Sequence, residues 1–250
     1  MKKYVQGIII PVLFLLLWYA VTRLQVFNEY LLPSPGTVWE ALTELAASGE
    51  LAKHLSISLR RVFLGFLLAA CTAIPLGIVC GRSRYFYTYC WFLLEFLRHV
   101  PPLAAIPLII LWAGIDEASK LTIIFLASFF PLFLNTSSGI RNCDPKLIEV
   151  GQSLGFSKTQ LIRHIQLPAA LESIVTGLQL SLGYSWRALI GAELIAASAG
   201  IGYLILDAEE MSRPDIVLAG MLCIGVIGSF LDWAFLHILQ RLIPWYRSKQ

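Results

Sequence analysis

Five ionisable residues lie in or beside long apolar stretches of this sequence: Glu95, Arg98, Arg187, Glu193 and Asp232. A charged side chain at the centre of a bilayer costs about 2.5–3.5 kcal/mol on insertion scales. We therefore expect each one to be paired, to reach water at a helix end, or to face a water-filled path. Glu95 and Arg98 are three positions apart, so they can neutralise each other on one helical face.

The alternative is that Arg98 and Arg187 line a path through the membrane and meet an anionic solute there. Prolines follow Arg98 directly, and a broken helix at membrane depth is tolerated only where protein or a water-filled cavity satisfies the freed backbone groups. The residues predicted to line such a path are Arg98, His99, Pro101, Pro102, Arg187 and Glu193.

The sequence offers no set of residues for catalysis, metal binding or nucleotide binding. It has no G-x-x-x-x-G-K-[ST] phosphate loop and no H-E-x-x-H motif, and its four histidines are scattered. Its five cysteines are odd in number and lack C-x-x-C spacing. We expect no catalytic residue, no metal site and no cofactor in this chain, and packed or interfacial roles for the histidines.

The composition indicates that the chain folds in a lipid bilayer rather than in water. Of 250 residues, 57% are hydrophobic and 14% are charged, whereas a soluble domain has about 25% charged residues. The mean hydropathy is +0.72. The formal net charge of +3 is too small to collect nucleic acid by bulk charge. These values exclude a soluble enzyme, a disordered chain and a nucleic-acid-binding domain, and they indicate an all-α polytopic membrane protein.

The apolar stretches predict about six transmembrane helices, because a span needs about 20 mostly apolar residues. The predicted spans are 8–27, 56–80, 85–113, 119–139, 168–190 and 216–239. The third is too long for one straight helix, and its prolines predict a break near Pro101. Residues 191–206 are apolar and contain Gly200 and Gly202, which favours a short re-entrant piece.

Polar residues between the spans predict the orientation. Lys and Arg gather on the side of the N-terminus, and Asp and Glu on the other. Both termini are therefore predicted to be cytoplasmic. Glu172, Arg60 and Arg61 are expected to reach water from span ends. Gly77 and Gly81 form a G-x-x-x-G pair, which allows close helix packing within the chain or in a dimer. No soluble domain is expected, so residues 1–250 are assigned to one transmembrane domain.

The outer polar stretch, 28–55, begins with a turn-forming Leu32–Pro35 cluster and continues with apolar residues at helical spacing. This pattern predicts an amphipathic helix on the membrane surface.

The cytoplasmic loop, about 140–168, has the pattern of a short helix, a turn at Gly155 and a second helix. Pro168 suits the first position of the helix that follows. A loop of this length with a regular apolar pattern is a surface on which another protein can dock.

The spacing of Glu149, Gly155, Ile165, Leu167 and Pro168 resembles the coupling-loop motif of ABC importer permeases. This resemblance implies the type I ABC importer permease fold and a role in ATPase coupling for these residues and for Gly151, which stands where the family usually has alanine. It also implies that ATP and Mg²⁺ are bound by a partner ATPase, so that the chain is not itself an enzyme.

Further segments are similar to the nitrate, sulfonate and taurine branch of these permeases: Leu32–Pro35, Arg98–Leu103 with Ile106-Pro107, Leu111-Trp112, and Gly200–Leu204. The resemblance implies a small anionic or zwitterionic solute, with a thiamine precursor, riboflavin or an aromatic acid as the alternative. The implied partners are two ATPase subunits, a second permease copy (a homodimer), an extracytoplasmic solute-binding protein and the lipid bilayer. The implied location is the bacterial inner membrane.

Two rivals belong to other classes. A secondary transporter or channel working alone needs coupling-ion carboxylates and usually inverted repeats, and the sequence shows no repeat. A membrane-embedded enzyme needs a nucleophile with a base, and none is recognisable.

Overall fold

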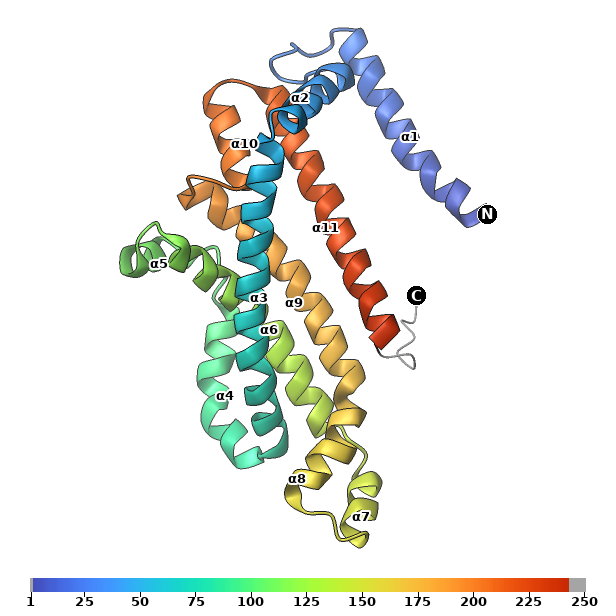
Figure 1. Ribbon diagram of the computed structural model, residues 1–250, viewed down its shortest axis with the longest axis vertical. Coiled ribbons are helices and arrows are strands. Elements are labelled where there is room, and N and C mark those ends of the chain that lie inside the picture. The colour runs from blue at the N-terminus through green and yellow to red at the C-terminus, as the bar shows by residue number, and fades with distance from the viewer. Residues whose placement is uncertain (1, 243–250) are drawn as a thin grey trace. The chain divides into compact units, whose positions relative to one another are not determined.

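The computed structural model describes residues 2–242, with side chains from residue 9 onward except those at positions 84 and 242. This part of the chain forms helices and contains no strand (Figure 1). The helices are α1 (Lys2–Arg23), α2 (Pro35–Ala47), α3 (Glu50–Arg82), α4 (Arg84–His99), α5 (Ile106–Ala113), α6 (Glu117–Arg141), α7 (Pro145–Ser153), α8 (Lys158–Leu161), the π-helical turn η1 (Ile162–Gln166), α9 (Leu167–Ala196), α10 (Ile201–Glu210) and α11 (Pro214–Leu242). The predicted all-α class is confirmed.

Each predicted span contains a long helix, although the first ends at Arg23, before residue 27, and the third is interrupted. Among the described residues, four stretches are long and apolar enough to cross a membrane: α3, α6, the stretch Lys158–Glu210, which contains α8, η1, α9 and α10, and α11. The apolar part of α1, Ile9–Arg23, is shorter. The third predicted span is divided into α4 and α5, which leave residues 100–105 between them, so the break near Pro101 is confirmed.

The prediction of one re-entrant piece over residues 191–206 is wrong in its bounds. Helix α9 continues to Ala196, and α10 begins only at Ile201. The boundary lies at Gly200, whose φ of 121° is unfavourable for residues with a side chain, so the helix is interrupted there rather than at Gly191.

The contacts divide the chain into two compact units. Unit 1 is Met1–Ser58 with Ala197–Ile227, and unit 2 is Leu59–Ala196 with Gly228–Gln250. Helices α3 and α11 contribute residues to both. The assignment of residues 1–250 to one domain stays a prediction.

Helices α6 and α9 lie side by side in unit 2 and form its core (Figure 1). Three buried serines connect them: the hydroxyls of Ser128 and Ser185 are 2.5 Å apart, and Ser181 donates to the Ser128 carbonyl. Small residues let helix backbones approach closely, and hydroxyls hydrogen-bond across the interface. The pair α6 and α9 is therefore a stable frame for the residues around it.

The G-x-x-x-G pair on α3 packs against α6 within the chain. A Cβ at Gly77 would lie 2.7 Å from the Cβ of Thr136, and one at Gly81 would lie 2.6 Å from the Ser137 carbonyl oxygen. Of the two roles that the sequence allowed, the structure uses this motif for packing inside the subunit.

In unit 1, α3 caps the beginning of α10. The buried ring of His54 accepts the Gly200 N–H through Nδ1 at 3.0 Å, and the Ser58 hydroxyl accepts the Ile201 N–H at 3.0 Å. Helix α2 begins after Ser34, whose hydroxyl accepts the Thr37 N–H, as expected from the turn cluster.

Candidate functional site

A cavity of 630 Å³ lies in unit 2, between the break after α4, the middle of α6 and the second half of α9. Most of its lining is apolar. Its polar lining side chains are Arg98, His99, Asn135, Tyr184 and Arg187.

The break that opens this cavity follows from two adjacent prolines. Val100 is extended (φ −78°, ψ 113°), as is usual for a residue before proline. Hydrogen bonds from the Ala104 N–H to the Pro101 carbonyl and from the Ala105 N–H to the Pro102 carbonyl then form a turn that leads into α5. The residues of this break, Val100, Pro101 and Pro102, line the cavity.

The two arginines of the cavity differ in their electrostatic surroundings. Arg98 forms an ion pair with Glu95 at 2.7 Å, one turn earlier on α4. This is the local pair that the three-residue spacing predicted. His99 is also tied to this turn, with Nδ1 at 2.7 Å from the Glu95 carbonyl oxygen. Arg98 therefore brings little net charge to the cavity.

Arg187 makes no ion pair within residues 9–241, whose side chains the structure describes. Its Nε donates to the Gly183 carbonyl at 3.0 Å, and its guanidinium carbon lies 4.9 Å from the centre of the Tyr184 ring. These contacts orient the guanidinium. Nη2 of Arg187 and Oδ1 of Asp232 on α11 both lie within 4 Å of the place that a Cβ on Gly183 would occupy, so a carboxylate is near this arginine although the two form no ion pair. Arg187 thus differs from Arg98 in having no ion-pair partner among the described side chains.

Five of the six residues predicted to line a path are brought together here: Arg98, His99, Pro101, Pro102 and Arg187. Their role in transport stays a prediction. Asn135 and Tyr184 were not predicted. The signal for Asn135 was available, since an amide in the middle of an apolar span needs a partner, and its Nδ2 donates to the Pro131 carbonyl at 2.8 Å.

Glu193, the sixth, does not line the cavity. Its side chain is 0% exposed and accepts a hydrogen bond from Nη1 of Arg61 at 2.8 Å. Arg61 also binds Glu117 at the beginning of α6, with Nε to Oε2 at 2.8 Å and Nη2 to Oε1 at 2.5 Å. The structure therefore favours a structural role for Glu193, as part of an ion network that joins α3, α6 and α9.

The expectation that Arg61 reaches water from a span end is wrong. Arg61 is buried between two carboxylates, whereas its neighbour Arg60 is exposed. A buried guanidinium is stable only when its hydrogen bonds are satisfied, and here Glu117 and Glu193 satisfy them from two other helices.

The predicted coupling loop forms α7, α8 and η1. A Cβ at Gly151 would overlap the Cδ1 atom of Ile165 and lie 2.6 Å from Cδ2 of Leu161. Glycine at this position lets α7 pack directly against the turn that leads into α9. Helix α7 ends at Ser153, and Gly155 has a φ of +76°, which fits the predicted turn.

The sequence predicted that Pro168 is the first residue of a helix, and the structure differs from this prediction. Pro168 is the second residue of α9, and the stretch from Lys158 through η1 into α9 is continuous. Because proline has no N–H and its ring clashes with the preceding turn, the hydrogen bonding widens just before it, and the Leu167 N–H donates to the Ile162 carbonyl.

Helix α7 presents an apolar stripe to solvent. Leu147 and Val150 on α7 and Leu154, which caps its C-terminus, are exposed and recur at the spacing of one helical face, while Glu149 is exposed on another side of the helix. Gly151 lies next to this stripe and attaches the helix to the rest of the loop through Ile165 and Leu161. The helix is therefore anchored along one edge of an exposed apolar stripe.

Comparison with known proteins identifies a family and several relatives that cover most of the chain. The family model described as "Binding-protein-dependent transport system inner membrane component" matches residues 73–244, which include the cavity and the loop. SsuC of Bacillus subtilis, which is proposed to be a permease for aliphatic sulfonates, is 42% identical over 99% of this chain and 90% of the relative.

The taurine transport system permease protein TauC of Escherichia coli is 37% identical, over 94% of this chain and 88% of its own length. The nitrate import permease protein NrtB of Synechocystis sp. is 34% identical, over 85% and 80%. An inward-facing structure of the MetNI methionine ABC transporter has a TM-score of 0.62 at 15% identity, covering 82% of this chain and 93% of that chain. At this identity the structural match shows a shared fold.

Proposed function

The chain belongs to the family of binding-protein-dependent transport system inner membrane components, and on this premise we propose that it conducts small oxyanions, of the sulfonate class, through the cavity that Arg187 lines. It is an ABC importer permease with the type I permease fold. Its relatives are named for sulfonates, taurine and nitrate, which share a compact group of charged oxygens.

The observation that carries this proposal is the unpaired guanidinium of Arg187. A planar guanidinium can donate two parallel hydrogen bonds to an oxyanion, and these charge-assisted bonds are about twice as strong as neutral ones. The apolar lining around it suits the short aliphatic part of an alkanesulfonate. Riboflavin is neutral and a thiamine precursor is neutral or cationic, so neither gains from this charge.

We propose that the substitution Arg187→Met lowers uptake of an alkanesulfonate more than a double substitution that removes the neutral Arg98–Glu95 pair does. Charge-assisted hydrogen bonds contribute about 1.5–3 kcal/mol, which corresponds to a roughly 10- to 100-fold rise in the solute concentration needed for half-maximal uptake. The measurement is ATP-dependent uptake of radiolabelled ethanesulfonate in proteoliposomes that contain the chain, its ATPase and its binding protein.

The matched control is Glu95→Gln/Arg98→Met, which removes both charges of the ion pair that Arg98, a lining residue, makes with Glu95, so that the net charge of the protein is unchanged. Its half-saturation value is expected to stay within a few-fold of the unmodified protein. Equal values for Arg187→Met and the control would contradict the assignment of Arg187.

The motor for this transport is proposed to be a separate ATPase that binds the exposed stripe of α7. Leu147, Val150 and Leu154 provide an exposed apolar face, and Gly151 fixes the helix to the entry of α9. Movement of α7 is then transmitted to α9 and, through the serine contacts, to α6. Such a rigid-body movement changes access to the cavity.

The proposed assembly contains two ATPase subunits, which bind ATP and Mg²⁺ and hydrolyse ATP, two copies of this chain, and an extracytoplasmic solute-binding protein. The family's description places such chains in the inner membrane. We propose that both termini and α7 are cytoplasmic, which is supported by the bias of Lys and Arg to that side.

A further inference from the structure

A second cavity, of 680 Å³, lies at the end of unit 2 that carries α7. It is formed by the last residues of α3 and α6 and the first two turns of α4. Arg82 and Arg141 line it together with Tyr87, Thr88 and Trp91. It is separate from the Arg187 cavity, and the proposed transport of a solute makes no use of it.

The charge in this cavity is strongly positive. Its lining contains two arginines and no carboxylate, and neither arginine makes an ion pair among the side chains that the structure describes. Arg141 lies over the Tyr87 ring at 5.4 Å, and Arg82 has one long contact of 3.4 Å from Nη1 to the Lys158 carbonyl oxygen. Most of their N–H donors are left for a ligand.

Helix dipoles do not cancel this charge. Arg82 and Arg141 end α3 and α6, whose C-termini each carry about half a negative elementary charge, while the N-terminus of α4 carries about half a positive one. A net positive charge of more than about one unit remains. The cavity is therefore suited to an oxyanion.

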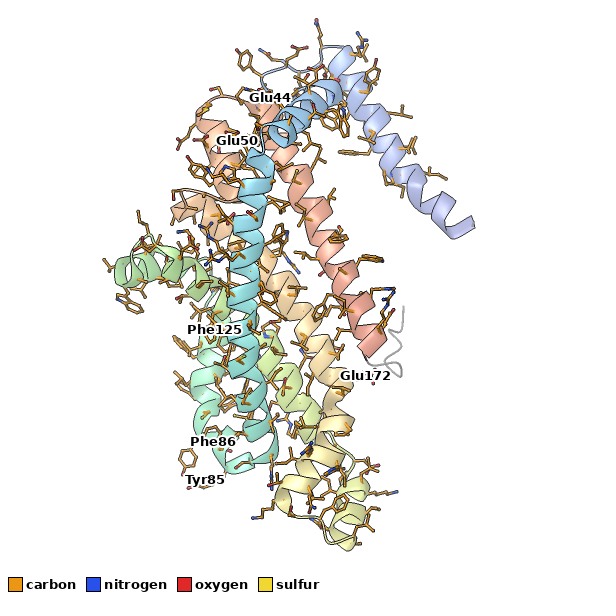
Figure 2. The ribbon with its side chains drawn as sticks, viewed as in Figure 1. Glu44, Glu50, Tyr85, Phe86, Phe125 and Glu172 are labelled. Atoms are coloured by element: carbon orange, nitrogen blue, oxygen red, sulfur yellow. The ribbon has the colours of Figure 1, made fainter. Side chains whose placement is uncertain are left out.

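The surface beside the cavity is apolar and aromatic. On α4, Tyr85, Tyr89 and Phe92 are 74%, 70% and 74% exposed, and their spacing places them on one face. Figure 2 shows Tyr85 and Phe86 at the beginning of α4, pointing away from the helices. Trp91, which lines the cavity, is also exposed. A ligand that fits both parts has a charged phosphate and long hydrocarbon chains.

We propose that this cavity binds the phosphate of an acidic phospholipid from the leaflet nearest α7, with the acyl chains along the aromatic face of α4. Basic pockets between transmembrane helices are suited to acidic headgroups, and tyrosine and tryptophan are enriched at this depth. The aromatic face of α4 favours a lipid over a free phosphate, because a free phosphate has no apolar group that can pack against this face.

The test is native mass spectrometry of the full chain in its purified assembly, titrated with phosphatidylglycerol or phosphatidylcholine. We expect retention of phosphatidylglycerol in preference to phosphatidylcholine. The double variant Arg82→Gln/Arg141→Gln is expected to weaken phosphatidylglycerol binding roughly tenfold or more, because two charged contacts are removed. Tyr85→Ala/Tyr89→Ala is expected to weaken it without changing the charge.

The matched control is Arg163→Gln/Arg241→Gln, which removes two exposed arginines outside the cavity. Ethanesulfonate uptake by the first double variant, compared with the Arg187 variants, separates this site from the transport path. Unchanged lipid binding in Arg82→Gln/Arg141→Gln would overturn the proposal. Displacement of the lipid by an equal concentration of inorganic phosphate would also overturn it, since the cavity would then hold a free oxyanion. Closure of the cavity by a second copy of the chain, detected by cross-linking at Trp91→Cys, would overturn it as well.

Discussion

Arginines in apolar surroundings have three different environments in this protein. Arg61 is buried between Glu117 and Glu193, Arg98 is paired with Glu95 at the edge of a cavity, and Arg187 faces the same cavity with no carboxylate bound. The same side chain is thus paired with carboxylates of two other helices, paired with a carboxylate of its own helix, or left without an ion pair among the described side chains. We expect this difference to decide which substitution affects stability and which affects transport.

Arg61→Met is expected to destabilise the chain strongly. It leaves the fully buried carboxylate of Glu193 without the guanidinium that now binds it, and removal of one partner of a buried pair costs about 3–5 kcal/mol. The measurement is the midpoint of thermal unfolding in detergent. Arg60→Met, one residue earlier and exposed, is the control, and its midpoint should stay near that of the unmodified protein.

The double variant Arg61→Met/Glu193→Gln keeps this prediction testable. Removing both charges relieves the buried carboxylate, so part of the lost stability should return. Equal unfolding midpoints for Arg61→Met and Arg60→Met would show that the network contributes nothing.

The position of the short helix α7 depends on Gly151, which stands where the permease family usually has alanine. In a helix, glycine costs about 1 kcal/mol relative to alanine. Here a Cβ would displace the side-chain ends of Ile165 and Leu161, so glycine gives α7 its close contact with them, and this contact offsets the intrinsic cost. The π-turn before Pro168 continues this packing into α9, which makes α7 and the beginning of α9 one connected element.

Gly151→Leu is therefore expected to separate α7 from α9 and to abolish uptake, while the chain still inserts in the membrane. ATPase activity of the assembly should remain and lose its dependence on solute-loaded binding protein. The matched control is Gly225→Leu on α11, where a Cβ meets nothing within 4 Å. Normal uptake by Gly151→Leu would show that this packing has no part in coupling.

The bias of basic residues predicts that α7 and the polar segment after α2 face opposite sides of the membrane. This prediction is tested with the exposed positions Ser153 and Ser48, replaced by cysteine in a chain whose other cysteines, except Cys143, are alanine. Cys143 can stay, because burial and the nearby Asp144 raise the pKa of its thiol and keep it unreactive near neutral pH.

A membrane-impermeant maleimide is expected to label Ser48→Cys in intact spheroplasts and Ser153→Cys only in inside-out vesicles. Labelling of Ser153→Cys in intact spheroplasts would place α7 outside and would remove the basis for coupling to a cytoplasmic ATPase. A second measurement is the ATPase that co-purifies with the chain. A chain that transports solute alone would favour the secondary transporter.

Much of this protein follows from local properties of the chain. Apolar runs long enough to span a bilayer, prolines at 101 and 102, and the spacing from Glu149 to Pro168 predict the helices, the break after α4 and the folded loop, because each depends on residues close in sequence. The Arg98–Glu95 pair was predictable for the same reason.

The partners of Arg61 were not predictable in this way, since Glu117 and Glu193 are 56 and 132 positions away and no helical spacing relates them. Nor could spacing distinguish Arg187, which faces a cavity, from Glu193, which is buried six residues later. Burial, and whether a charged side chain meets a carboxylate from a distant part of the sequence, are decided only when separate helices pack together.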